Sequence, residues 1–285
     1  MFFAVPRQQP STAGVWRGMG VVMRSAVLDL RNAKVPACGI AAMAKASVPG
    51  RTKTRLVPPL TFEQAAQCNT AFLRDIAENI LAAATQTSIA GYIAYGPADA
   101  QPFFQANLPP DIGLIEACYP SLGACLDHAI AQLFERGHRA AVVVNSDSPT
   151  LPTSLLLEAA EVLARPGDRA VLGPALDGGY YLLGVKAQHR RLFEDIAWST
   201  QHVTQQTQQR AAELRLPMHI LPTWYDVDDA SALKILLAEL FEGQSFAPDL
   251  CPARPRHTRA LFQSLVESSE LKDRLALGAF RRAAE

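Results

Sequence analysis

Short apolar strands that alternate with helical stretches constrain the fold of this chain most strongly. The segments GIAAMA (39–44) and AAVVVN (140–145) are too apolar for either to have one face in water. Further strand-like runs lie at 88–96, 170–175, 180–185 and 219–222, and helical patterns at 61–84, 122–137, 154–164, 202–215 and 231–243. This alternation predicts a three-layer α/β/α fold with a mostly parallel sheet that is covered on both faces.

The alternating pattern does not extend to the chain ends, which divides the 285 residues into three parts. Residues 1–36 show no consistent period and form a predicted N-terminal extension, poorly ordered in part. Residues 37–243 form the predicted α/β domain. Residues 244–285 are predicted to be a Pro-rich linker followed by one amphipathic helix.

The charge balance limits the classes of partner. Lys plus Arg equals Asp plus Glu at 27 each, so the chain has no overall positive field of the kind that binds nucleic acid or an acidic membrane. No segment has enough consecutive apolar residues to span a bilayer, and the first residues lack the apolar run of a secretory signal. We therefore expect a cytoplasmic protein, with its five cysteines buried and reduced.

The heptapeptide PGRTKTR (49–55) is a cationic turn that follows directly on the first strand. It matches neither the GxxxxGK[ST] phosphate loop nor the GxGxxG dinucleotide motif, and a solvated basic loop is the simplest alternative. A Pro-Gly turn after a buried strand nevertheless allows close backbone approach to a ligand, with Arg51, Lys53 and Arg55 around it. Clustered cations in this position favour an anion with several oxygens, such as a phosphate chain.

Two groups of acids follow or precede other elements. Asp147 comes just after the strand 140–145, and Asp226, Asp228 and Asp229 precede the last core helix. Each group is also explained by helix capping or by the helix dipole. Because ligands bind at the carboxyl ends of parallel strands, we expect Asp147 and Asp228 to converge on one cleft opposite the loop from Arg51 to Arg55. There the two carboxylates would hold Mg²⁺ or Mn²⁺.

Two further motifs offer substrate contacts. In LDGGYYLLG (176–184) the DGG sequence is typical of a hairpin turn, while Gly178 and Gly179 leave space for a sugar or base and Asp177 can accept hydrogen bonds from hydroxyl groups. In AWST (197–200), Ser199 or Thr200 can cap the next helix, and Trp198 offers a stacking platform. The sequence contains no HExxH or GxSxG motif, so nothing indicates a zinc or serine hydrolase.

Taken in order, five motifs resemble those of the bacterial selenodomain-associated or arsenosugar-type transferases, a glycosyltransferase-like family. The resemblance covers residues 38–243 and rests on MAKASVPGRTKTRL (43–56), NSDSPTLP (145–152), GPALDGGYYLLG (173–184), LFEDIAWST (192–200) and DVDDASAL (226–233). It implies the GT-A, Rossmann-like fold of nucleotide-diphospho-sugar transferases, which is similar to that of 2-phospholactate and molybdenum-cofactor guanylyltransferases. The chain departs from the family pattern at Ser47, at Asn145 and after Gly123, where an acidic residue is expected.

The resemblance also implies roles for individual residues. The nucleotide diphosphate would be held by Lys45, Gly50, Arg51, Lys53 and Arg55, the metal by Asp147 and Asp228, and catalysis would involve Asp147, Lys53 and Asp177. Gly178, Gly179, Trp198, Ser199 and Thr200 would contact substrate. The implied activity is metal-dependent transfer of a sugar from a nucleoside-diphosphate sugar to a small acceptor. Two alternatives stay open, a nucleotidyltransferase acting on a small phosphorylated acid and a non-catalytic nucleotide-binding protein.

Overall fold

The computed structural model describes residues 35–267, 271 and 274. The predicted N-terminal extension, apart from residues 35 and 36, lies outside the described residues. The boundaries proposed at residues 37 and 243 stay predictions. None of the described helices combines the length and apolarity that crossing a bilayer requires.

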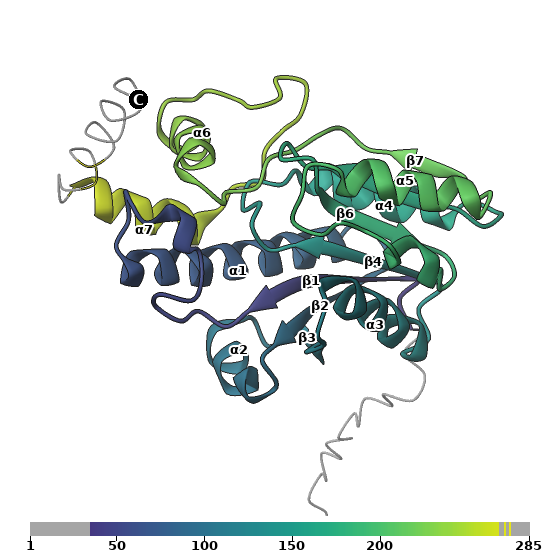
Figure 1. The fold of residues 1–285 in the computed structure, drawn as a ribbon. Helices are drawn as coiled ribbons and strands as arrows, with labels where there is room; N and C mark the ends of the chain where they lie inside the picture. The colour runs from purple at the N-terminus through teal and green to yellow at the C-terminus, as the bar shows by residue number, and fades with distance from the viewer. Residues whose placement is uncertain (1–34, 268–270, 272–273, 275–285) are drawn as a thin grey trace, which may run out of the picture. The chain divides into compact units, whose positions relative to one another are not determined.

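The strands and helices alternate along most of the chain (Figure 1). The strands are β1 (Cys38–Lys45), β2 (Ile89–Gly96), β3 (Gly113–Glu116), β4 (Ala140–Asn145), β5 (Ala170–Pro174), β6 (Tyr180–Val185) and β7 (Met218–Ile220). The α-helices are α1 (Phe62–Ala84), α2 (Gln101–Asn107), α3 (Leu122–Glu135), α4 (Thr153–Ala164), α5 (Val203–Glu213), α6 (Ala230–Phe241) and α7 (Arg256–Glu267). The described part of the chain also contains short 3₁₀ helices, η1 (Thr54–Leu56), η2 (Ala98–Ala100) and η3 (Arg190–Phe193).

The seven strands found among the described residues form one sheet in the order β3-β2-β1-β4-β6-β5-β7. The pairs β1–β2, β1–β4, β2–β3 and β5–β7 are parallel, whereas β6 runs antiparallel to both β4 and β5. The reversal follows from the short DGG connection between β5 and β6, because a few residues can join only antiparallel neighbours. The predicted α/β fold with a mostly parallel sheet is confirmed.

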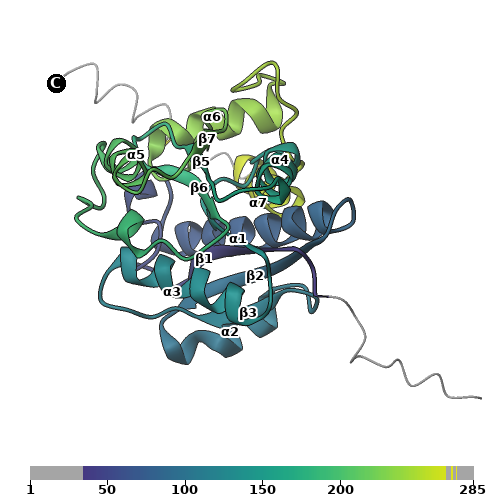
Figure 2. The ribbon, with the colours of Figure 1, turned by 90° about the vertical axis from the view of Figure 1, so that its right-hand side faces the viewer.

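Helices cover both faces of the sheet (Figure 2). One buried cluster contains side chains from α1, α4, α6 and α7, and a second contains side chains from α3 and α5. Within β1, Ile40 and Ala42 belong to the first cluster and Ala41 to the second. A strand buried on both faces needs apolar residues at every position, which is why GIAAMA shows no polar alternation.

Several elements begin and end where the sequence indicates. Thr61 caps α1 through a complete capping box with Gln64, and Gly137 follows α3 with a φ of +90°. The pattern missed α2 and β3, because both are short and α2 carries a proline in its first turn. The expectation that all five cysteines are buried is wrong, since only Cys38 and Cys68 are buried while Cys118 and Cys251 are exposed.

Candidate active site

The cationic turn is a compact structure held by its own hydrogen bonds. The Val48 backbone N–H donates to the Thr52 hydroxyl, and that hydroxyl donates back to the Val48 carbonyl, both over 3.1 Å. Gly50 has a φ of +73°, which glycine adopts without strain. Lys53 also has a positive φ, of 53°, which is uncommon for a residue with a side chain.

The Lys53 ammonium group lies between the two acids that the sequence singles out. Its Nζ is 2.6 Å from Asp147 Oδ1, 2.8 Å from Asp228 Oδ1 and 2.9 Å from the Val227 carbonyl oxygen. Three acceptors match the three N–H donors of an ammonium group. The Lys53 side chain is only 5% exposed, so this is a buried charge that its partners must balance.

The electrostatics of the bridge follow from burial and from opposite charge. Burial alone would lower the pKa of Lys53, but the neighbouring carboxylates of Asp147 and Asp228 more than reverse this effect, and the pKa is raised. Burial would raise the pKa of Asp228, and the charges of Lys53 and Arg55 reverse that effect, so the pKa is lowered. Arg55 contacts Asp228 Oδ2 from the solvent side. Lys53 and Asp228 are therefore both charged at neutral pH.

Helix capping does not explain Asp147 or Asp228. Helix α4 begins at Thr153, six residues beyond Asp147, and the residue before it, Pro152, makes no side-chain cap. The cap of α6 is Asp229, whose Oδ1 accepts from the Ser231 and Ala232 backbone N–H groups over 2.7 and 2.9 Å. Of the three acids in WYDVDDASAL, capping thus accounts for Asp229.

Asp226 is a cleft residue to which the sequence analysis gave no role. Burial raises its pKa to about 7, and the negative charges of Asp177, Asp228 and Asp147 contribute in the same direction. The sequence shows Asp226 as one of three nearby acids, but its neighbours in space, such as Asp147 and Asp177, come from distant parts of the chain. Its environment is therefore invisible to sequence reasoning.

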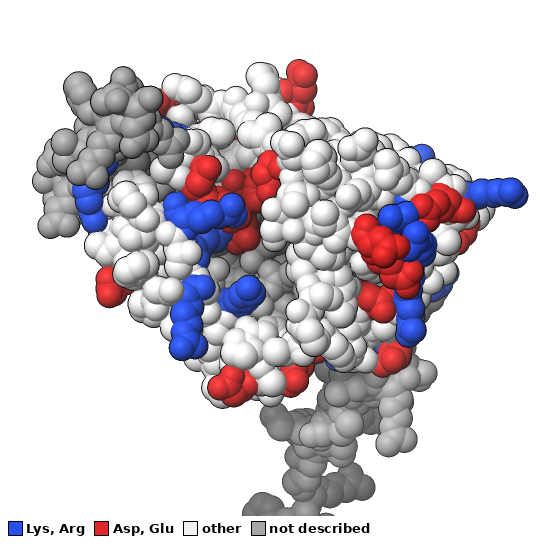
Figure 3. Space-filling model, viewed as in Figure 1, with Lys and Arg blue, Asp and Glu red and all other residues white. Residues whose placement is uncertain are grey.

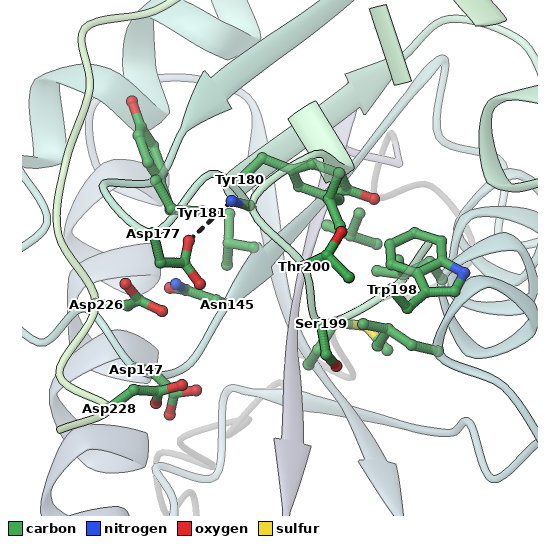
Figure 4. Close-up of a pocket in the computed structure, with 18 of the residues that line it drawn as sticks. Asn145, Asp147, Asp177, Tyr180, Tyr181, Trp198, Ser199, Thr200, Asp226 and Asp228 are labelled. Atoms are coloured by element: carbon green, nitrogen blue, oxygen red, sulfur yellow. Dashed lines mark hydrogen bonds between the residues drawn. The ribbon is translucent and has the colours of Figure 1, made fainter. Parts of the chain in front are cut away.

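A cavity of about 380 Å³ lies on one side of the carboxylates (Figure 4). Asp177 belongs to the turn between β5 and β6, where its Oδ1 accepts the Gly179 backbone N–H over 2.8 Å. Gly178 has a φ of +91°, and a Cβ there would lie 2.3 Å from the Gln201 carbonyl oxygen. Gly178 packs the hairpin against the loop that follows Trp198 and does not line the cavity. Asp177 and Gly179 do line it.

The AWST segment forms the opposite wall of this cavity. Trp198, Ser199 and Thr200 all line it, and Figure 4 shows them across the cavity from Asp147 and Asp226. The segment does not cap α5 with a side chain, because the residue before the helix is His202. Instead the Thr200 hydroxyl donates to the Ala197 carbonyl over 2.7 Å, which closes the turn. Ser199 has a φ of 64°.

A second cavity, of about 710 Å³, lies on the side of the cationic turn. Its lining includes Lys45, Arg51, Lys53 and Arg55, but not Gly50, whose contribution is the shape of the turn. The sequence analysis missed other residues that line this cavity, among them Asn69, Cys118 and Tyr119. Asn69 donates to the Lys45 carbonyl over 3.0 Å and to Ser47 Oγ over 2.9 Å, so it fixes the end of β1.

The two cavities meet at the carboxylates. Arg55, Asn145, Asp147 and Asp228 line both of them. Figure 3 shows basic and acidic atoms side by side on this face, next to a hollowed region. A ligand in the basic cavity and a second ligand in the acidic cavity would therefore approach each other beside Asp147.

The donor set at the junction fits a hard divalent cation. Its carboxylates are Asp147, Asp177, Asp226 and Asp228, and the cations among them are Lys53 and Arg55. The negative charge in excess of these cations and the carboxylate oxygen donors favour binding of Mg²⁺ or Mn²⁺. Lys53 already neutralises one oxygen of Asp147 and one of Asp228, so a metal would share these carboxylates with the lysine.

A different group meets a three-ligand spacing for metal among the described residues. Asp75, Glu78 and His257 each offer one atom within 4.8 Å of the others. However, both Asp75 oxygens accept hydrogen bonds from the first residues of α7, and Glu78 accepts from Arg256 and His257. These carboxylates attach α7 to α1, and none of the three residues lines either cavity.

Comparison with known proteins agrees with the α/β fold described above. The model of an uncharacterised protein family conserved in bacteria, DUF2064, matches residues 79–200. A crystal structure of a candidate nucleotide-diphospho-sugar transferase from Desulfovibrio desulfuricans G20 has 28% sequence identity and a TM-score of 0.70. The similarity covers 84% of this chain and 98% of that one. No curated protein matches the sequence.

Two further solved structures are more distant. CMP:2-keto-3-deoxy-manno-octonic acid synthetase has 11% identity and a TM-score of 0.47, over 73% of this chain and 99% of that one. A cytidylyltransferase from Leptospira borgpetersenii has 9% identity and a TM-score of 0.47, over 82% and 96%. At these values neither similarity bears on the activity. The Desulfovibrio structure resembles this chain in sequence as well as in fold.

Proposed function

We propose that this chain is a metal-dependent glycosyltransferase that moves a sugar from a nucleoside-diphosphate sugar to a small acceptor. The observation that carries the proposal is the junction of a basic cavity and an acidic cavity at Asp147 and Asp228. Transfer between two ligands needs two adjoining compartments that meet at the reacting bond. The similarity to the Desulfovibrio protein and the ordered motifs shared with selenodomain-associated or arsenosugar-type transferases support this function.

In this proposal the basic cavity takes the nucleotide. Arg51 and Arg55 supply cationic hydrogen-bond donors for the diphosphate, and Lys45 lies at the end of β1 beside them. Lys53 holds Asp147 and Asp228 in place and adds positive charge beside the leaving diphosphate. A divalent metal held by Asp147 and Asp228 would neutralise the charge that grows on the leaving group.

The acidic cavity takes the sugar and the acceptor. Asp177 has one carboxylate oxygen on the Gly179 N–H, and the group lines the cavity, where it can accept hydrogen bonds from hydroxyl groups. Ser199 and Thr200 line the same cavity. The hairpin and the loop that carry these groups hold them in position before the ligand binds.

The products distinguish this function from its alternatives. Purified protein is incubated with Mn²⁺ or Mg²⁺ and a panel of nucleoside-diphosphate sugars, and products are identified by mass spectrometry. Release of a nucleoside diphosphate supports glycosyl transfer, whereas release of pyrophosphate from nucleoside triphosphates supports nucleotidyl transfer. Tight nucleotide binding without turnover of any substrate would indicate a non-catalytic binding protein.

A further inference from the structure

The acidic cavity has a charge pattern that selects the chemistry of the second substrate. Asp147, Asp177, Asp226 and Asp228 line it, and Arg55 is its one cationic side chain among the described residues. Arg55 is already bound to Asp228. A phosphate or carboxylate group that entered this cavity would meet like charge without a free cation to pair with, which opposes binding.

The same carboxylates favour a ligand that donates hydrogen bonds. An ionised carboxylate only accepts, so a cavity lined by carboxylates is complementary to hydroxyl groups rather than to anionic oxygens. A divalent metal and a diphosphate at the junction would engage Asp147 and Asp228. Asp177 and Asp226 would stay on the side of the acidic cavity as acceptors for hydroxyl groups.

The wall across from the carboxylates is aromatic. Tyr180 and Trp198 both line the cavity, and their ring centroids are 6.4 Å apart at an interplanar angle of 74°. The Tyr180 hydroxyl is buried and has no hydrogen-bond partner, and burial strongly raises its pKa. A wall of this kind takes the apolar face of a sugar-like ring, while hydroxyl groups at the ring edge face the carboxylates.

The tryptophan is held in place by close packing rather than by a hydrogen bond to its ring. A Cβ at Gly123 in α3 would lie 3.0 Å from Trp198 Cζ2, 3.1 Å from Trp198 Nε1 and 2.9 Å from the Phe193 carbonyl oxygen. The Ala197 backbone N–H donates to Gln206 Oε1 over 2.7 Å and anchors the loop to α5. Glycine at position 123 therefore allows the indole to sit against α3 at the edge of the cavity.

From these observations we infer that the acceptor is an uncharged, hydroxyl-rich ring that stacks on Trp198, and that phosphorylated or carboxylated acceptors are excluded. The inference rests on the proposed transferase function only in calling the ligand an acceptor. The binding preference itself does not depend on turnover. It also separates the proposed function from transfer to a small phosphorylated acid, which would need free cations in this cavity.

Ligand binding to the full chain tests the inference without requiring catalysis. The neutral probes are methyl glucoside, methyl galactoside, methyl mannoside and myo-inositol, and each is paired with its own phosphate monoester. Binding of every probe is measured by saturation-transfer NMR. We expect at least one neutral ring to bind, with its phosphate ester at least about tenfold weaker, the factor that about 1.4 kcal/mol represents. Equal or tighter binding of the phosphate esters, or no binding of any neutral ring, would overturn the inference.

Variants locate the binding. Trp198→Ala should weaken the neutral ring about tenfold or more, Trp198→Phe should restore part of the loss, and Gly123→Ala should weaken binding although the indole is intact. Asp226→Asn should bring the phosphate ester closer to its neutral partner by about tenfold. Binding that is unchanged in Trp198→Ala would contradict the stacking role. Affinity for UDP or GDP, measured by calorimetry on each variant, shows that the basic cavity is intact.

If nucleoside diphosphate binding fails while ring binding persists, the transferase proposal is wrong and the ring site stands. If nucleotide sugars turn over while only anionic acceptors bind, the transferase proposal stands and the ring site is wrong. The two results are thus distinguishable.

Discussion

Two acidic clusters in this protein look alike in composition and differ in what their oxygens do. At the α1–α7 contact, Asp75 accepts from the His257 and Thr258 backbone N–H groups over 2.9 and 2.8 Å and from the Thr258 hydroxyl over 2.5 Å. At the cavity junction, Asp147 and Asp228 face a lysine ammonium group and two cavities. Carboxylates saturated by backbone donors attach a helix, whereas carboxylates balanced by a side-chain cation keep the capacity to bind a ligand.

The largest effect on stability is expected from Lys53→Met, which removes the buried cation of the junction. Loss of one partner of a buried ion pair costs about 3–5 kcal/mol of unfolding free energy, because the remaining charges are uncompensated. Adding Mn²⁺ should recover more stability in the variant than in the wild type, since the metal can replace the missing charge. Urea unfolding with and without Mn²⁺ measures both effects.

Lys45→Met, on an exposed lysine at the end of β1, is the matched control and should change stability little. If Lys53→Met unfolds at the same urea concentration as the wild type, the ion-pair account of the junction is wrong.

The second prediction concerns how stability depends on pH in protein from which a chelator has removed any metal. The pKa of Asp226 is raised by burial to about 7 in the folded state, above the ordinary value of 3.8 for an aspartate. Its contribution to stability is therefore fully present below pH 3.8 and lost as the pH rises through 7, a loss of about 2–4 kcal/mol. Asp226→Asn should remove this loss, and so be more stable than the wild type at pH 8.

Denaturation curves between pH 4 and 8 give the comparison directly. A wild-type curve and an Asp226→Asn curve that run parallel over this range would show that Asp226 does not carry the effect.

At the α1–α7 contact we expect Asp75→Ala to cost about 2–3 kcal/mol, because it leaves buried N–H donors of α7 without an acceptor. Affinity for UDP or GDP should stay unchanged, and Mn²⁺ should not compensate the loss of stability. Asp111→Ala, on an exposed acid ahead of β3, is the control for removal of a surface charge. A fall in nucleotide affinity in Asp75→Ala would erase the distinction between the two clusters.

The smallest effect is expected from Glu78→Gln at the same contact. Hydrogen bonds from Arg256 and His257 outweigh burial and lower the pKa of Glu78, but the group is partly exposed and screened by solvent. We expect a loss of about 0.5–1 kcal/mol at neutral pH. Because a lowered pKa contributes stability only above the unfolded value, the loss should vanish as the pH falls through the pKa of the folded state, and acid titration of both proteins measures this.

Local signals in the sequence predict much of the fold. Apolar runs predict the inner strands, Thr61 predicts the start of α1, and the DGG motif predicts the hairpin between β5 and β6. Elements of a few residues, such as β3, lack enough periods to stand out. The direction of β6 within the sheet follows from its pairing with β4, which is a long-range contact.

The site was harder to predict where its chemistry depends on distant neighbours. Gly178 looked like a substrate residue, but it packs against Gln201, 23 positions along the chain. Asp75 lies within an ordinary helical pattern and is buried only because α7 returns to it. By contrast, the ends of β1 and β4 are neighbours in the sheet, and that is why residues in the loops that follow these strands, Lys53 and Asp147, come together.

The most direct test of the account is calorimetric titration of Mn²⁺ together with UDP or GDP into wild type and Asp147→Asn, with Asp111→Asn as the control. Asparagine nearly preserves the size of the side chain and removes the charge that a divalent cation requires. The account predicts that metal-linked nucleotide affinity falls by about 10–100-fold or more in Asp147→Asn and stays unchanged in Asp111→Asn. Equal metal-linked affinity in wild type and Asp147→Asn would contradict it.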